Sequence, residues 1–96
     1  MTQRITQAHL EAKIATLNRM MGKPEQPYQD ERDQAGNLVP NVGTFMLSGA
    51  YGGYCVHRMC QGGGAADVLS IGHVKARELA DLLSAYMRGI YDGRNV

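Results

Sequence analysis

The sequence lacks both a large charge excess and a long apolar run. Its 96 residues carry 10 lysines and arginines against 9 aspartates and glutamates, for a net charge of +1. Such a chain has no overall attraction to nucleic acid or to an anionic membrane, so any partner is recognised locally. No apolar stretch approaches the roughly 18 residues of a membrane-spanning helix, and the first residues contain no continuous apolar segment of the kind a signal peptide needs. We therefore expect a cytoplasmic protein without a membrane partner.

Cysteine is scarce, and catalytic signatures are absent. Cys55 and Cys60 lie five apart in a segment that alternates like a strand, so they project from opposite faces and both are expected to be reduced. The chain contains no nucleophile elbow, Walker loop, HExxH or CxxC motif. His57, His73 and Cys55 have no recognised metal-site spacing. We therefore expect no catalytic residue, no metal and no cofactor.

Two segments carry apolar residues at helical spacing. Residues 5–21 place four of them on one stripe, with Thr6 as an N-cap, and residues 74–90 form a second amphipathic pattern. Residues 22–43, which contain all three prolines, are polar and rich in acidic side chains. They predict a long loop that serves as a flap or an arm, with a local turn near Ala35-Gly36-Asn37.

The next part of the chain alternates in the manner of β-strands. Segments 44–50 and 54–60 are expected to form an antiparallel hairpin, because Tyr51-Gly52-Gly53 between them supplies the positive φ values that a tight reversal requires. A second glycine-rich reversal at 62–66 leads to a third strand, expected at 68–71.

These elements predict one α+β domain over residues 1–96. The order α-β-β-β-α gives a three-stranded antiparallel meander with two helices packed on one face. The other face is left for solvent, a ligand or a partner. A chain of this size buries only about 60–65% of its unfolded surface, so self-association is a natural way to complete its core. We expect a homo-oligomer.

Glycine is dense next to aromatic and basic side chains in the middle of the chain. Glycine lets a ligand approach the backbone, a tyrosine face stacks on a base, and an arginine fork holds a phosphate. A plainer alternative also fits: the glycines serve two hairpins, the tyrosines cover the core edge and Arg58 forms a surface ion pair. The candidate ligand-binding residues are Gly49, Tyr51, Gly52, Gly53, Tyr54, Arg58, Gly63, Gly64, His73 and Arg77.

A basic pair opens the second helical segment. Lys75 and Arg77 stand where positive charge opposes the helix dipole. They either contact an anion or pair with Glu78 or Asp81 on the helix surface.

Part of this pattern resembles a known protein family. The segments that carry the likeness are GAYGGY (Gly49 to Tyr54), Arg58-Met59, Asp67-Val68, Gly72-His73 and Arg77-Glu78-Leu79. They resemble a family of small uncharacterised proteins encoded by tailed bacteriophages and prophages, and the likeness covers most of the chain. The resemblance implies a counter-defence context, in which oligomeric sponges sequester cyclic-nucleotide or ADP-ribose-type immune signals without cleaving them. It carries over no residue roles.

The favoured hypothesis is a non-enzymatic phage accessory protein that binds and sequesters a small nucleotide-type immune signal. Tyr51 and Tyr54 would stack on or cover the base, and Arg58 would hold a phosphate. An alternative from another class is an inhibitor that docks its sheet face or its acidic loop on a host defence protein.

Two further hypotheses rank lower. The element order is also that of double-stranded RNA-binding domains, but only Lys75 and Arg77 stand where that family has a run of lysines. An enzyme acting on a nucleotide, with His57 or His73 as general acid or base, lacks an evident nucleophile or orienting partner in the sequence.

Overall fold

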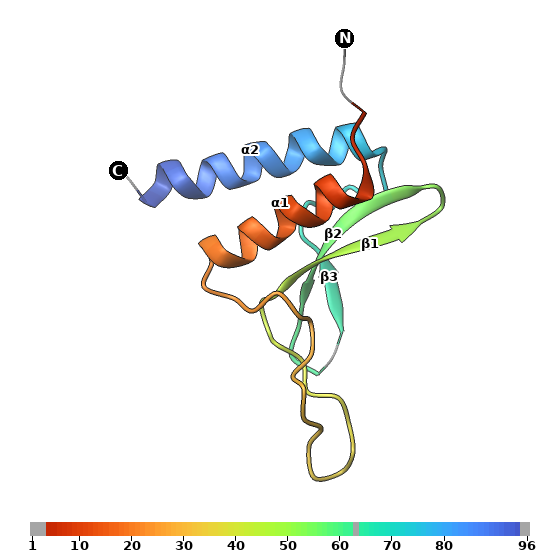
Figure 1. Ribbon diagram of the computed structural model, residues 1–96, viewed down its shortest axis with the longest axis vertical. Coiled ribbons are helices and arrows are strands. Elements are labelled where there is room, and N and C mark those ends of the chain that lie inside the picture. Colours follow the sequence, from red (N-terminus) through yellow and green to blue (C-terminus); the bar gives the residue numbers. More distant parts are fainter. Residues whose placement is uncertain (1–3, 63, 95–96) are drawn as a thin grey trace.

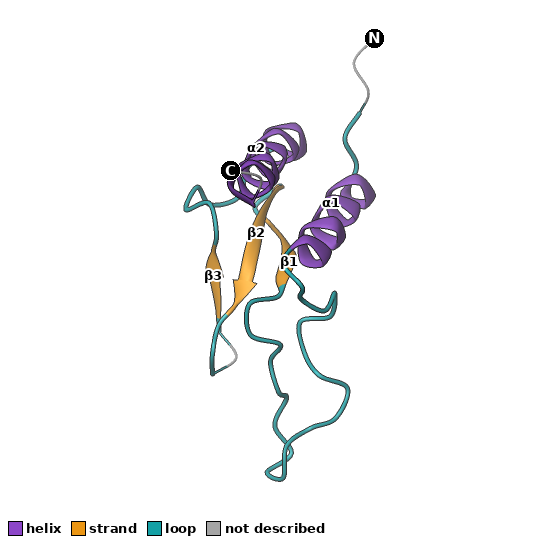
Figure 2. Ribbon diagram, turned by 90° about the vertical axis from the view of Figure 1, so that its left-hand side faces the viewer, coloured by secondary structure: helices purple, strands orange, loops and turns teal. Residues whose placement is uncertain are grey.

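The computed structural model describes residues 4–62 and 64–94. Both helices pack on one face of a three-stranded antiparallel sheet, as Figures 1 and 2 show, so the α-β-β-β-α order and the α+β class are confirmed. The elements are α1 (Gln7–Met20), β1 (Phe45–Ala50), β2 (Gly53–Met59), β3 (Ala65–Asp67) and α2 (Ala76–Arg94).

The start of α1 is set by a reciprocal cap. Thr6 has extended backbone angles, and its hydroxyl accepts a hydrogen bond from the backbone N–H of His9 at 3.3 Å. The His9 Nδ1 atom accepts one from the backbone N–H of Thr6 at 3.2 Å. This capping box uses a histidine where glutamate or glutamine is usual, and it confirms Thr6 as the N-cap.

The β1–β2 hairpin closes through a two-residue turn. The register runs from Phe45 opposite Arg58 to Ala50 opposite Gly53. The two turn residues have φ values of 55° (Tyr51) and 74° (Gly52). Two consecutive positive φ values match the right-handed twist of the flanking strands, so the hairpin predicted from the sequence is confirmed.

The third strand lies earlier in the chain than expected. Residues 65–67 pair with 57–59, whereas residues 68–71 form a loop, so the expected strand at 68–71 is wrong. Ala65 and Ala66 carry no β-branched or aromatic side chain, which hides the strand from a sequence pattern. The Asp67 carboxylate then accepts three backbone N–H groups of the following loop, which ends the strand.

The core fills the space between the helices and the sheet. Fully buried leucines of α1 and α2 pack against Phe45 and Val56 of the sheet. Asn18 of α1 is a buried polar exception, and its amide bonds both backbone polar groups of Phe45. The helix therefore covers one end of the outer edge of β1, where an unpaired strand would otherwise expose its backbone.

Residues 22–43 form an arm that projects from the body of the protein (Figures 1 and 2). Its two limbs are joined by backbone hydrogen bonds from Gln29 to Val39 and from Asn41 to Pro27, both at 2.8 Å. At the tip, the Asp33 carboxylate accepts the backbone N–H groups of Ala35 and Asn37. The local turn expected there is thus present.

Neither helix within 4–62 and 64–94 has both the length and the apolar character needed to cross a bilayer.

Candidate functional site

The two faces of β2 divide the predicted site residues. Tyr54 and Val56 point toward the helices and pack with the core, and Arg58 shares their face by alternation. Cys55 and His57 belong to the opposite face. A single site on one face therefore cannot use all the side chains of this strand.

The segment before α2 returns to the hairpin and crosses it closely. Val74 pairs with Tyr54 through two backbone hydrogen bonds, of 2.7 and 2.8 Å. A Cβ atom on Gly53 would lie 2.8 Å from the carbonyl oxygen of Val74 and 3.2 Å from the carbonyl carbon of His73. Gly53 is thus required by the close approach of two backbones, and the crossing places His73 beside the hairpin.

Tyr51 stands at the tip of the hairpin, next to His73. Its side chain is 97% exposed, and its ring lies 5.7 Å from the His73 ring in an edge-to-face arrangement. Lys75 and Arg77 follow at the start of α2, which lies over this end of the sheet (Figure 1). Six of the predicted site residues lie here, namely Gly49, Tyr51, Gly52, Gly53, Tyr54 and His73, and Arg77 follows in the first turn of α2.

Arg58 and the second glycine turn lie at the other end of β2. Arg58 is five residues from Gly53, about 17 Å along an extended strand. Its guanidinium lies 5.1 Å from the centre of the Phe45 ring, and its Nε donates a hydrogen bond to the carbonyl of Gly43 at 3.3 Å. Gly64 belongs to the turn before β3, and Gly63 lies outside the described residues. The structure does not bring Arg58 or Gly64 to Tyr51.

A row of polar side chains lies on the sheet face opposite the helices; sequence reasoning selected His73 as a ligand-binding residue, but not the other members of the row. The Nε2 atom of His73 is 3.1 Å from the Ser48 hydroxyl and 3.7 Å from the Cys55 sulfur. The rings of His57 and His73 are 6.3 Å apart. We name Ser48, His57 and His73 the polar strip. Strand alternation puts Ser48 and His57 on one face, but the return of His73 depends on the loop before it.

Asp67 shapes that loop. Its carboxylate accepts backbone N–H groups from Gly72 at 2.7 Å, Ser70 at 3.1 Å and Leu69 at 3.2 Å. These bonds, led by the one from Gly72, hold the pKa of Asp67 below its ordinary value, with a smaller contribution from His57. The loop that carries His73 back over the sheet is thus anchored to an ionised carboxylate.

The thiol of Cys55 lies beneath the polar strip. Burial, together with the negative charge of Asp67, raises the pKa of Cys55, and the Ser48 hydroxyl opposes this in part. A buried thiol of this kind is neutral near pH 7 and is neither a nucleophile nor a ready metal ligand. Both Cys55 and Cys60 are free, as expected.

Replacing Asp67 with asparagine should change how stability responds to pH. A carboxyl whose pKa is lower in the folded state stabilises the fold above its unfolded value, near 3.9, and loses that contribution as the pH falls through the folded value. We expect Asp67→Asn to be less stable than the parent at pH 7, with the gap narrowing below about pH 4. Urea unfolding at pH 7 and pH 3 measures the difference in the free energy of unfolding between the variant and the parent, and Asp92→Asn is the exposed control. An unchanged gap at the two pH values would contradict this role.

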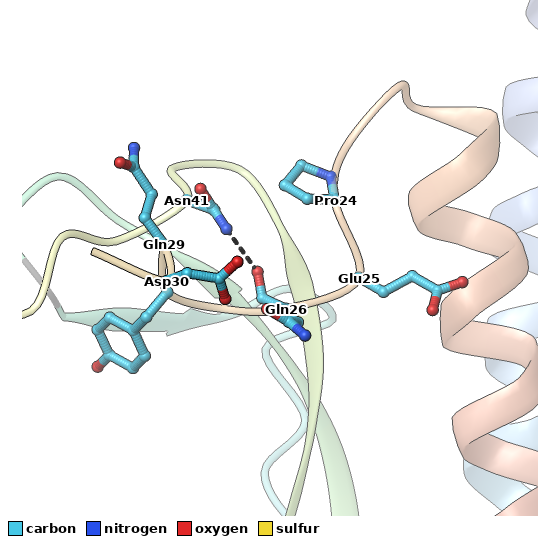
Figure 3. A pocket seen from close by; sticks show the side chains of 7 residues that line it. Pro24, Glu25, Gln26, Gln29, Asp30 and Asn41 are labelled. Carbon is cyan, nitrogen blue, oxygen red and sulfur yellow. Dashed lines mark hydrogen bonds between the residues drawn. The ribbon is translucent and has the colours of Figure 1, made fainter.

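Two grooves lie away from this end of the sheet. One, with a volume of about 540 Å³, occupies the base of the arm, where the Asn41 amide donates a hydrogen bond to the carbonyl of Gln26 at 2.8 Å (Figure 3). The other, of about 260 Å³, lies between α1 and β1. Glu25 lines both and points toward α1 in Figure 3. No predicted site residue lines either of these two grooves.

Among residues 4–62 and 64–94, no group of three or more histidine, cysteine, aspartate and glutamate side chains is arranged to hold a metal ion. Comparison of the chain with protein-family models, curated proteins and solved structures finds no match. The function must therefore be argued from the geometry of the hairpin end.

Proposed function

We propose that the chain is a non-enzymatic binding protein for a small nucleotide-type ligand. The site is the end of the sheet where the β1–β2 turn, His73 and the start of α2 meet. One observation carries the proposal: a fully exposed Tyr51, held at a fixed turn, stands beside the half-buried ring of His73. An aromatic face that is open to solvent on a rigid hairpin is suited to stacking on a base.

The charges at this end also favour an anionic ligand. Lys75 is an exposed cation just before α2, and the first turn of α2 contains one acidic residue, Glu78. Lys75, which precedes α2, has a side chain that only donates hydrogen bonds, so it does not cap the helix as serine or aspartate would. The positive end of the helix dipole adds to the charge of Lys75.

Arg58 has no part in this proposal. Its guanidinium contacts Phe45 and Gly43 at the far end of β2, so its contacts support a structural role. The phosphate role expected from the sequence remains a prediction for that end of the sheet.

The biological context follows from the resemblance to small phage and prophage proteins. In that context the protein acts in the cytoplasm of an infected host, as a homo-oligomer, and sequesters a nucleotide immune signal without cleaving it.

A ligand screen followed by one substitution tests the proposal. Linear and cyclic di- and trinucleotides and cyclic ADP-ribose isomers are tested for a rise in Tm, which should reach about 10 °C at 100 times Kd. Tyr51→Ala should then weaken binding about 10- to 100-fold, the contribution of one stacked base, without lowering Tm. Tyr91→Ala is the control, because Tyr91 is an exposed tyrosine near the end of α2. Equal affinity of Tyr51→Ala and the parent would refute the site, and a product in the incubation would refute sequestration.

A second candidate function is the inhibition of a host protein through the arm. The observation that favours it is the projection of residues 22–43, on which Leu38 and Val42 are each 50% exposed. Exposed apolar side chains on an arm are suited to burial against a partner. If this function holds, no small molecule in the screen raises Tm, and changes within residues 25–33 abolish activity.

A further inference from the structure

The polar strip lies on the sheet face opposite the helices, and its His73 ring lies next to Tyr51. Ser48 and His73 share a hydrogen bond of 3.1 Å, and the second imidazole, His57, has its ring centre 6.3 Å from that of His73. All three side chains are only partly buried. A hydroxyl and two imidazoles therefore face the same space beside an exposed aromatic ring.

The groups around the strip leave it suited to an anion. From β3, Asp67 faces His57 and attracts it electrostatically, but three backbone N–H groups already share the charge of this carboxylate. From β2, the Cys55 thiol is buried and neutral. From the hairpin turn, the Tyr51 ring contacts the His73 ring of the strip, and Lys75 follows His73 by two residues.

We infer that the polar strip is the phosphate subsite of the proposed nucleotide site, so that the ligand is a nucleotide rather than a nucleoside and binds more tightly as the pH falls. The inference rests on the proposed function. The base stacks on Tyr51, and a phosphate oxygen accepts hydrogen bonds from His57 and His73. Ser48 acts as a positioning residue, because its bond to Nε2 fixes the orientation of the His73 ring.

The pH dependence follows from the chemistry of imidazole. Histidine is the side chain that ordinarily gains its positive charge between about pH 5 and 8, and only its protonated form donates from both ring nitrogens. An anion that binds the protonated form more tightly takes up a proton on binding, so affinity rises as the pH falls. An uncharged nucleoside at the same site has no such dependence.

The probes are 3′,5′-cyclic AMP and adenosine. The phosphodiester keeps one negative charge from pH 6 to pH 8, so a change in affinity reports on the protein. By calorimetry, we expect the Kd of cyclic AMP to fall about tenfold from pH 8 to pH 6, the effect of one charge-assisted hydrogen bond, while the Kd of adenosine stays constant. His57→Gln and His73→Gln should each reduce this dependence and leave adenosine binding intact. His9→Gln is the matched control, because His9 caps α1 on the other face of the sheet and glutamine can replace it there.

The outcomes separate the inference from the proposed function. If both probes bind with no dependence on pH, or if adenosine binds as tightly as cyclic AMP at pH 6, the phosphate subsite is refuted and the base site on Tyr51 stands. If neither probe binds, the phosphate subsite is refuted, and the proposed function is then decided by the wider ligand screen. If His73→Gln lowers Tm, Ser48→Ala replaces it as the test, and weaker binding of cyclic AMP with unchanged binding of adenosine supports the subsite. Equal losses for both probes would contradict it.

Discussion

Replacing Asn18 with leucine should lower the free energy of unfolding by about 3 kcal/mol, since two backbone groups would lose their partner. Asn18 is 1% exposed, its Nδ2 donates to the carbonyl of Phe45 at 3.0 Å, and its Oδ1 accepts the N–H of Phe45 at 2.8 Å. Leucine fills a similar volume and can make neither bond. The N–H and C=O of Phe45 would then remain buried at the edge of β1 without partners.

The expected loss corresponds to a fall in Tm of roughly 15 °C, which thermal and urea unfolding can both measure. Asn41→Ala is a suitable control, because Asn41 makes one amide-to-backbone bond on the exposed arm and should change stability little. An Asn18→Leu variant as stable as the parent would show that the backbone of Phe45 reaches water, and that α1 does not cover this end of β1.

Much of the fold could be predicted because it depends on local patterns. The spacing of Leu10, Ile14 and Leu17 fixes the buried face of α1, and the glycines after Tyr51, between two alternating segments, indicate a tight reversal. Local patterns failed where local preference is weak. β3 consists of two alanines and an aspartate, and α2 continues to Arg94 although Gly89 and Gly93 both weaken a helix.

The candidate site could be predicted only in part. Tyr51 and His73 were among the residues selected from the sequence, but the hydrogen bond from Ser48 to His73 spans 25 positions and depends on how one loop folds back. Arg58 was selected as a partner of Tyr51. Strand alternation places it on the face opposite His57, and the length of β2 places it at the end of the strand far from the turn. Composition shows which side chains are present, whereas the crossing of Val74 over the hairpin decides which of them meet.

That crossing makes Gly53 the position where a single methyl group should affect both stability and binding. In Gly53→Ala the new Cβ would lie 2.8 Å from the carbonyl oxygen of Val74 and 3.1 Å from its nitrogen. Both neighbours are backbone atoms, which cannot turn aside as a flexible side chain can. The segment 73–74 must therefore move away from β2, and its two hydrogen bonds to Tyr54 lengthen or break.

We expect Gly53→Ala to lose about 2 kcal/mol of stability by overpacking, or roughly 10 °C in Tm. Displacement of His73 should also weaken nucleotide binding by the molecules that remain folded. Calorimetry under conditions where the variant is folded measures this loss separately from the loss of stability. Gly49→Ala is the matched control on the paired strand, because the nearest atoms to its Cβ would be those of the Tyr54 ring, at an ordinary 3.8 Å. If both alanine variants were equally stable and bound equally well, the close backbone approach at Gly53 would not be what holds His73 beside Tyr51.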